Sequence, residues 1–193
     1  MNLEIECRLL EVNAKDFIKK LNEQNATFVG DWIQTRYVYD FNPVKENSWI
    51  RLRTNGVETT LTIKEIVSAQ IDGTKEWEIG VSDFNTADEM LNKLGYHARN
   101  KQENRRIQYI LDDVEVDIDF WPMIPTYVEF EAQNEEQILK ICKKLNIAFS
   151  DLVTLDVSSI YDHYGLNLKK QPAILTLENE RKAKIYPSSQ LEK

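Results

Sequence analysis

The feature of this sequence that most constrains its fold is a series of short segments in which apolar and polar residues alternate. Successive side chains of a β-strand point to opposite faces, so alternation with a period of two predicts strands with one apolar and one charged face. The predicted strands are 3–12, 34–41, 48–53, 58–64, 75–80, 105–111, 114–119 and 126–131. Eight strands of this kind can pair as an antiparallel sheet with an apolar side and a charged side.

Helical periodicity separates some of these strands. The predicted helices are 14–25, 86–94, 135–145 and a shorter stretch within 150–164. Asn13 and Asn134 stand where N-caps are expected, and Gly95 stands where the second helix would end. Strands and helices in this order predict the α+β class, with several helices packed on the outside of the sheet.

Two turns fix the register of neighbouring strands. Asn55-Gly56 is typical of a two-residue type I′ hairpin loop. A loop of that length predicts that Arg53 pairs with Glu58. In this register the arginines of 48–53 share a face with the polar residues of 58–64, and the apolar residues of both strands lie on the other face.

The second turn is Asp112-Asp113, between strands 105–111 and 114–119. A two-residue loop there predicts that Arg106 pairs with Asp119. The apolar residues of both strands then lie on one face without exception. A slip of one residue would mix the two faces, so the pattern itself supports this register.

Charged residues recur at every second position in five segments. These sets are Glu4/Glu6/Arg8, Arg51/Arg53, Glu76/Glu78, Glu115/Asp117/Asp119 and Glu129/Glu131. The charged face of an antiparallel strand usually points to water. Here, however, acidic and basic strands alternate along the chain, and the bases are mostly arginines, whose planar fork suits phosphate and carboxylate. The pattern favours a closed eight-stranded antiparallel β-barrel, a tunnel with a charged lumen.

Such a lumen would need ligands of both signs. Clustered carboxylates repel one another and take up protons unless a cation compensates them, and Mg²⁺ or Mn²⁺ prefers oxygen ligands of this kind. Clustered guanidinium groups need an anion in turn. A polyphosphate that bridges the metal and the guanidinium groups satisfies both halves with one ligand.

Composition excludes several other classes of function. The chain has 193 residues, with 24 Lys and Arg against 32 Asp and Glu, for a formal net charge of −8. This balance argues against a nucleic-acid or membrane-surface partner. Its two cysteines, Cys7 and Cys142, exclude a disulfide framework, and the presence of only two histidines argues against a multi-histidine metal cage. With no apolar leader at its start and no apolar run of about 20 residues, the chain is expected to be cytoplasmic.

The segment Glu4-Ile5-Glu6-Cys7-Arg8 resembles the E-x-E-x-K signature of the CYTH, or triphosphate tunnel metalloenzyme, superfamily. This superfamily includes class IV adenylyl cyclases, thiamine triphosphatase and inorganic tripolyphosphatases. The resemblance continues in order through Arg51-Leu52-Arg53, Lys64, Glu76-Trp77-Glu78, the R-x-x-aromatic pair Arg106 and Tyr109, Asp119, and Glu129-Phe130-Glu131. It spans about residues 3–165, so we expect a tunnel domain at 1–168 and a polar tail at 169–193.

The resemblance implies a set of site residues. The implied ligands of one or two Mg²⁺ or Mn²⁺ ions are Glu4, Glu6, Asp117, Asp119, Glu129 and Glu131. The implied triphosphate contacts are Arg8, Arg51, Arg53, Lys64 and Arg106, and the implied catalytic residues are Arg8, Glu76 and Glu78.

The sequence departs from the family pattern at three positions. Arg8 stands where the family has lysine, and Asn104 stands where a lysine is common. Arg36 stands where an acidic residue is common. Because Arg36 shares strand parity with Asp40, we expect it to face the lumen and to add a substrate contact.

The expected function is metal-dependent hydrolysis of inorganic tripolyphosphate or an organic triphosphate. Two alternatives stay open: a class IV-type adenylyl cyclase that forms cyclic AMP and pyrophosphate from ATP, and a phosphate-binding module without turnover. The expected partner is a triphosphate-containing small molecule, and a homodimer is left open as the oligomeric state.

Overall fold

The computed structural model describes residues 2–68, 73–168 and 174–177 of the chain. Its eight main strands are β1 (Asn2–Leu9), β2 (Thr27–Tyr39), β3 (Ser48–Thr54), β4 (Thr59–Ile66), β5 (Thr74–Gly80), β6 (Ala98–Leu111), β7 (Val114–Phe120) and β8 (Tyr127–Ala132). They pair in the order β6-β2-β3-β4-β5-β1-β8-β7, and a β6–β7 pairing closes the ring. Every neighbouring pair in this ring is antiparallel, which confirms the predicted eight-stranded tunnel.

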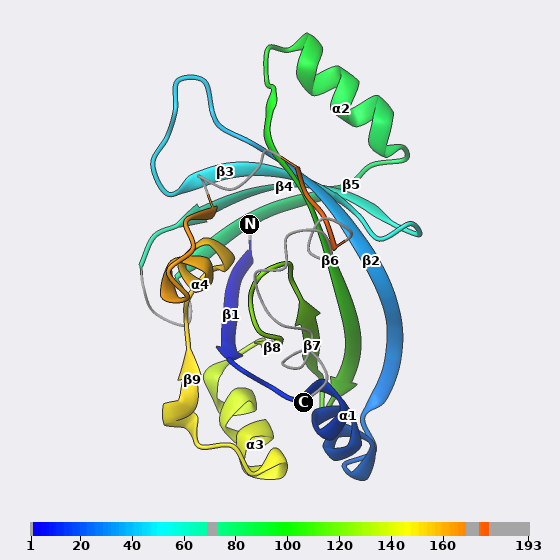
Figure 1. The fold of residues 1–193 in the computed structure, drawn as a ribbon, viewed down its shortest axis with the longest axis vertical. Coiled ribbons are helices and arrows are strands. Elements are labelled where there is room, and N and C mark those ends of the chain that lie inside the picture. Colours follow the sequence, from blue (N-terminus) through cyan, green and yellow to red (C-terminus); the bar gives the residue numbers. More distant parts are fainter. Residues whose placement is uncertain (1, 69–72, 169–173, 178–193) are drawn as a thin grey trace.

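Helices and short strands surround the ring (Figure 1). The helices are α1 (Ala14–Glu23), α2 (Phe84–Lys93), α3 (Glu135–Leu145), a 3₁₀ turn (Phe149–Asp151) and α4 (Val157–His163). Two short strands, β9 (Leu152–Val153) and β10 (Ile174–Leu175), pair with β1 and β6 respectively. Figure 1 shows α2 at one end of the sheet and α1 and α3 at the other. In the described ranges, no helix is long and apolar enough to cross a membrane.

The predicted helix caps are present. The Oδ1 atom of Asn13 accepts from the backbone N–H of Asp16 at 3.1 Å, and that of Asn134 accepts from Gln137 at 3.0 Å. Both bonds satisfy N–H groups that the first helical turn leaves without a partner. Gly95 has a φ of +89°, a left-handed conformation that favours glycine and ends α2.

The apolar faces of the strands point outward, and helices cover part of this outward surface. The main core joins β1, β6, β7 and β8 to α1 and α3. Its buried members include Cys7, Ile107, Tyr109, Val116, Ile118, Val128, Phe130, Phe17, Leu21, Ile138, Ile141 and Leu145. A smaller cluster packs Leu91 of α2 on Tyr39, Ile50 and Leu52. Because alternate side chains take opposite faces, covering the apolar face from outside turns the charged face into the tunnel.

Both thiols are expected to be unreactive in the folded protein. Cys7 and Cys142 are buried in the main core. Burial raises the pKa of Cys7 to about 12 and also raises that of Cys142, so neither forms the nucleophilic thiolate at neutral pH. A colorimetric disulfide reagent should label the native protein slowly and the urea-unfolded protein fast. Rapid labelling of the native protein would contradict the packing of these two side chains.

The first predicted hairpin register is wrong by two residues. In the structure Arg53 pairs with Thr60 rather than Glu58, so the loop has four residues, 55–58. The Oδ1 atom of Asn55 accepts from the backbone N–H groups of Val57 at 2.9 Å and Glu58 at 2.8 Å, which stabilises the longer loop. A shift of two leaves every side chain on its predicted face. The second register, with Arg106 opposite Asp119, is confirmed.

The other differences lie at element boundaries. The predicted helical stretch 150–164 is helical only in part: β9 occupies Leu152–Val153, and α4 begins at Val157. Strands β2 and β6 extend beyond the predicted 34–41 and 105–111 because they pair with each other along most of their length, and a bulge in β2 between Phe28 and Gly30 breaks the period of two. A short strand, β10, lies within the predicted tail. Residues 169–173 and 178–193 of the predicted tail lie outside the described parts.

Candidate functional site

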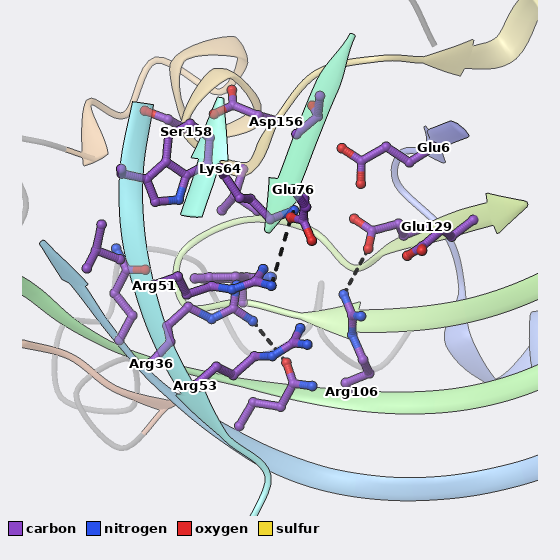
Figure 2. Close-up of a pocket in the computed structure, with 18 of the residues that line it drawn as sticks. Glu6, Arg36, Arg51, Arg53, Lys64, Glu76, Arg106, Glu129, Asp156 and Ser158 are labelled. Atoms are coloured by element: carbon purple, nitrogen blue, oxygen red, sulfur yellow. Dashed lines mark hydrogen bonds and ion pairs between the residues drawn. The ribbon is translucent and has the colours of Figure 1, made fainter. Parts of the chain in front are cut away.

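A cavity of about 590 Å³ occupies the tunnel. Every strand of the ring contributes at least one polar or charged side chain to its wall, among them Glu6, Arg36, Arg51, Lys64, Glu76, Arg106, Glu115 and Glu129. Residues 156–158, at the start of α4, complete the lining. The charged faces of the predicted strands therefore point into the lumen, as Figure 2 shows for its labelled strand residues, among them Arg36, Arg51 and Glu129.

Opposite charges gather on opposite sides of the ring. The neighbouring strands β5, β1, β8 and β7 carry the carboxylates Glu76, Glu78, Glu6, Glu129, Glu131 and Glu115. The neighbouring strands β4, β3, β2 and β6 carry the cations Lys64, Arg51, Arg53, Arg36 and Arg106. This division matches the predicted arrangement of carboxylates facing guanidinium groups.

Arg8 is an exception on the acidic side, and carboxylates neutralise its charge. Its Nε donates to Oε2 of Glu129 at 2.8 Å, and its Nη2 lies 2.6 Å from the same oxygen and 2.9 Å from Oε2 of Glu6. Nη1 donates to the backbone carbonyl of Leu155 at 2.7 Å. Because carboxylates and a carbonyl already occupy this guanidinium, Arg8 holds β1, β8 and the segment before α4 together.

Arg106 is neutralised in the same way. Its Nε and Nη2 donate to Asp119 at 3.0 and 2.6 Å, its Nη1 contacts Asp117, and Nη2 also reaches Oε1 of Glu129 at 3.1 Å. Asp117 and Asp119 are buried behind Arg106 and do not line the cavity. Burial raises the pKa of Asp117 to about 7, against the lowering effect of Arg106. Burial alone would raise the pKa of Glu129, but Arg8 and Arg106 hold it well below its usual range.

Arg36 of β2 and Arg53 of β3 stay charged at neutral pH although they lie close together. Arg36 and Arg53 occupy directly opposed positions of the two strands, and Arg51 lies two residues along. Burial and the charges of Arg51 and Arg53 lower the pKa of Arg36 to about 9, and Arg51 and burial lower that of Arg53 to about 9. Like charges held this close in a buried place are costly, and an anion between them removes the cost.

A second group of contacts links β3, β4 and β5. Lys64 forms an ion pair with Glu76. Glu78 accepts from Thr62 Oγ1 at 2.6 Å and from Arg51 Nη2 at 3.4 Å. Burial would raise the pKa of Glu78, but the bond from Thr62 and the charge of Arg51 lower it, so this partly exposed carboxylate is ionised at neutral pH.

Three carboxylates form a row across the acidic wall. In the strand registers Glu6 is opposite Glu131, and Glu131 is opposite Glu115. Like charges in directly opposed positions repel, so this row favours a bound cation. Carboxylate oxygens are the donors that Mg²⁺ and Mn²⁺ prefer, so the donor chemistry fits such an ion. Within the described residues, however, no three acidic, histidine or cysteine side chains are already grouped as a metal site.

The structure brings most of the predicted site residues together. Glu6, Arg8, Arg36, Arg51, Arg53, Lys64, Glu76, Glu78, Arg106, Glu129 and Glu131 all line the cavity. The backbone of Glu4 pairs with Thr74, and its side chain lies outside the described parts. Asp117 and Asp119 face Arg106, as described above. The ligand roles of all these residues stay predictions.

Sequence reasoning gave no role to several residues of the cavity wall. Glu115 shares parity with Asp117 and Asp119 but, unlike them, lines the cavity. Gln34 and Gln102 line the same wall as Arg36. Strand parity alone could have placed all three in the lumen, but neutral amides stand out less in a sequence than charged residues do.

The closed strand ring and its divided charges define a β-tunnel protein with a charged lumen. The chain belongs to the CYTH domain family, whose model matches residues 2–160. A comparison with curated proteins gives no match.

Solved structures share the fold at low identity. A conserved hypothetical protein from Pyrococcus furiosus is 23% identical with a TM-score of 0.69, over 81% of this chain and 99% of its own. A proposed adenylate cyclase from Vibrio parahaemolyticus is 13% identical with a TM-score of 0.70, over 83% and 98%. A proposed adenylyl cyclase from Hippeastrum, described as having a dominant triphosphatase activity, is 13% identical with a TM-score of 0.57, over 88% and 98%. These likenesses support the tunnel fold.

Proposed function

We propose that this protein is a divalent-metal-dependent phosphohydrolase that binds inorganic tripolyphosphate or an organic triphosphate inside the tunnel. The observation that carries the proposal is the buried pair Arg36 and Arg53, which stand directly opposite each other beside Arg51; close like charges of this kind favour a bound anion. A chain of phosphoryl groups supplies several negative charges along one line. The triphosphatase activity named for the Hippeastrum neighbour agrees with this proposal.

Each wall of the tunnel has a part in the proposed reaction. Arg51, Arg53 and Lys64 bind the phosphoryl oxygens, and Arg51 and Lys64, which lie beside the carboxylates of β5, neutralise the charge that develops as the bond to the terminal phosphorus breaks. Glu6, Glu131 and Glu115 would hold Mg²⁺ or Mn²⁺, with Glu4 as a further predicted ligand. When bound, this ion polarises phosphoryl oxygens and lowers the pKa of water. Glu78, ionised and partly exposed, is placed to orient a water molecule, while Glu76 positions Lys64.

The proposal can be tested with the purified protein and two substrates. Incubation with Mg²⁺ or Mn²⁺ and tripolyphosphate should release orthophosphate, followed by phosphorus NMR, and excess chelator should stop the release. Cyclic AMP and pyrophosphate from ATP would instead support the cyclase. Measurable tripolyphosphate binding without any product, with either metal, would support a binding module.

Arg53→Ala should weaken tripolyphosphate binding by about 1.5–3 kcal/mol, or roughly 10- to 100-fold in Kd. The reason is that Arg53 supplies a charged donor in a largely buried wall, and among the described residues it has no hydrogen bond or ion pair that competes with a ligand. Isothermal titration calorimetry without metal measures this loss directly. An unchanged Kd would place the ligand elsewhere in the tunnel.

A further inference from the structure

The buried arginines of the lumen are of two kinds. Arg8 and Arg106 donate mainly to carboxylates, which cancel their charge. Arg36 instead donates from Nη2 to two amide oxygens, Oε1 of Gln34 at 2.9 Å and Oδ1 of Asn104 at 2.6 Å. Because an amide oxygen carries no formal charge, these bonds hold the guanidinium in place without a carboxylate of the described residues bound to it directly, and the nearest carboxylate, Asp119, lies behind Asn104.

The surroundings of Arg36 hold its positive charge in a fixed position. Arg36 is 7% exposed, and its guanidinium carbon lies 4.4 Å from the ring centre of Trp121, in a cation–π contact. Its Nε has no hydrogen-bond partner among the described residues. Arg36 also stands directly opposite Arg53, and Figure 2 shows both side chains extending into the same part of the cavity. Arg36 and Arg53 are therefore two opposed cations, and the Arg36 Nε is a buried donor without a partner among the described residues. Together they form a preorganised binding site for an anionic group.

The position of this pair in the tunnel indicates which part of a ligand it meets. Strands β4, β3 and β2 are adjacent, so β4 and β2 lie about 10 Å apart, and Lys64 and Arg36 are also offset along the strands: Lys64 is opposite Trp49, and Arg36 is opposite Arg53. In the proposed function the terminal phosphoryl group that is hydrolysed lies beside the carboxylates. The opposite end of the ligand then reaches Arg36 and Arg53. An ester there would place a neutral organic group against two cations that no carboxylate of the described residues binds directly.

We propose that Arg36 is a specificity-determining residue: together with Arg53 it takes a free, fully ionised terminal phosphoryl group, so ligands with free phosphoryl groups at both ends bind more tightly than triphosphate esters. This inference rests on the proposed binding of a phosphoryl chain in the tunnel. It does not depend on turnover or on metal.

Calorimetric titrations of the full-length protein in chelator test it, with inorganic tripolyphosphate and ATP as the two ligands. The unmodified protein should bind tripolyphosphate about tenfold more tightly than ATP. Arg36→Gln should weaken tripolyphosphate binding by about tenfold and leave ATP binding within about threefold. Arg36→Lys, which keeps the charge, should restore part of the difference in affinity between tripolyphosphate and ATP. As a matched control, Arg105→Gln removes the same charge from an exposed ion pair with Asp31 and should change neither affinity.

Thermal unfolding separates binding from a purely structural role. Removing a buried charge that faces other cations should raise the melting temperature of the ligand-free Arg36→Gln protein, and the stabilisation by tripolyphosphate should shrink. A lower melting temperature with unchanged affinities would make Arg36 a structural residue and overturn the inference. Equal losses for both ligands would also overturn it. If the unmodified protein binds neither ligand, the proposed function itself fails.

Discussion

Arg106→Ala is expected to lower the free energy of unfolding by about 3–5 kcal/mol, the usual result of removing one partner from a buried ion pair. The Arg106 side chain is 11% exposed and is the shared partner of three carboxylates, Asp117, Asp119 and Glu129. Without it these negative charges would face one another in a buried layer. Urea denaturation at neutral pH measures the loss.

The adjacent residue provides the control for this prediction. Arg105 points outward and forms an exposed ion pair with Asp31, so Arg105→Ala should cost about 0–1 kcal/mol. The difference in the free energy of unfolding between Arg106→Ala and the unmodified protein should become smaller as the pH falls. The reason is that protonated carboxyl groups carry no charge for the guanidinium to neutralise. A loss below about 1 kcal/mol for Arg106→Ala would mean that the carboxylates are hydrated or compensated in another way.

Glu131→Gln is expected to reduce metal-dependent turnover by about 100-fold or more, since a metal ion in such a site supplies several kcal/mol of transition-state stabilisation. Glu131 lines the cavity between Glu6 and Glu115 in the strand registers. It is a better choice than Glu129, whose replacement would also break the ion pairs with Arg8 and Arg106. Rates at several Mn²⁺ concentrations measure the effect.

Two controls test whether a loss of turnover in Glu131→Gln comes from the site itself rather than from a change in net charge or in fold. Glu89→Gln, which removes the same charge from the exposed face of α2, should leave turnover unchanged. The far-ultraviolet circular dichroism of Glu131→Gln should match that of the unmodified protein, because glutamine has the same shape as glutamate. Turnover of Glu131→Gln at the unmodified rate would remove this residue from the proposed metal site.

The strands were predictable where one face packs under helices. In β7 and β8 every outward residue from Val114 to Ile118 and from Val128 to Phe130 is buried, so apolar alternation is complete. The outward face of β5 differs: Trp77 is 39% exposed and Ile79 62% exposed, although their alternation resembles that of core strands. Alternation predicts which face a side chain takes, but it does not show whether another element covers that face.

For the candidate site, too, the sequence predicted which face of a strand each side chain takes, but not which partners it contacts. Parity correctly placed Arg51, Arg53 and Glu129 in the lumen. It could not separate the carboxylates that face the cavity from Asp117 and Asp119, which share that parity but are drawn behind Arg106. That difference depends on side-chain contacts between strands. Nor could parity show that amides, rather than carboxylates, hold Arg36.

The pairing of β1 has a consequence for how the protein is made. This first strand pairs with β5 and β8, and the Arg8–Glu129 bond joins residues 121 positions apart. During synthesis β1 leaves the ribosome long before β8, so the two strands cannot pair until most of the chain has been made. Contacts this distant in sequence also form slowly. Until then water hydrates the charged faces. The charged cavity therefore does not form strand by strand during synthesis, and affinity for the proposed ligand is expected only once the ring closes.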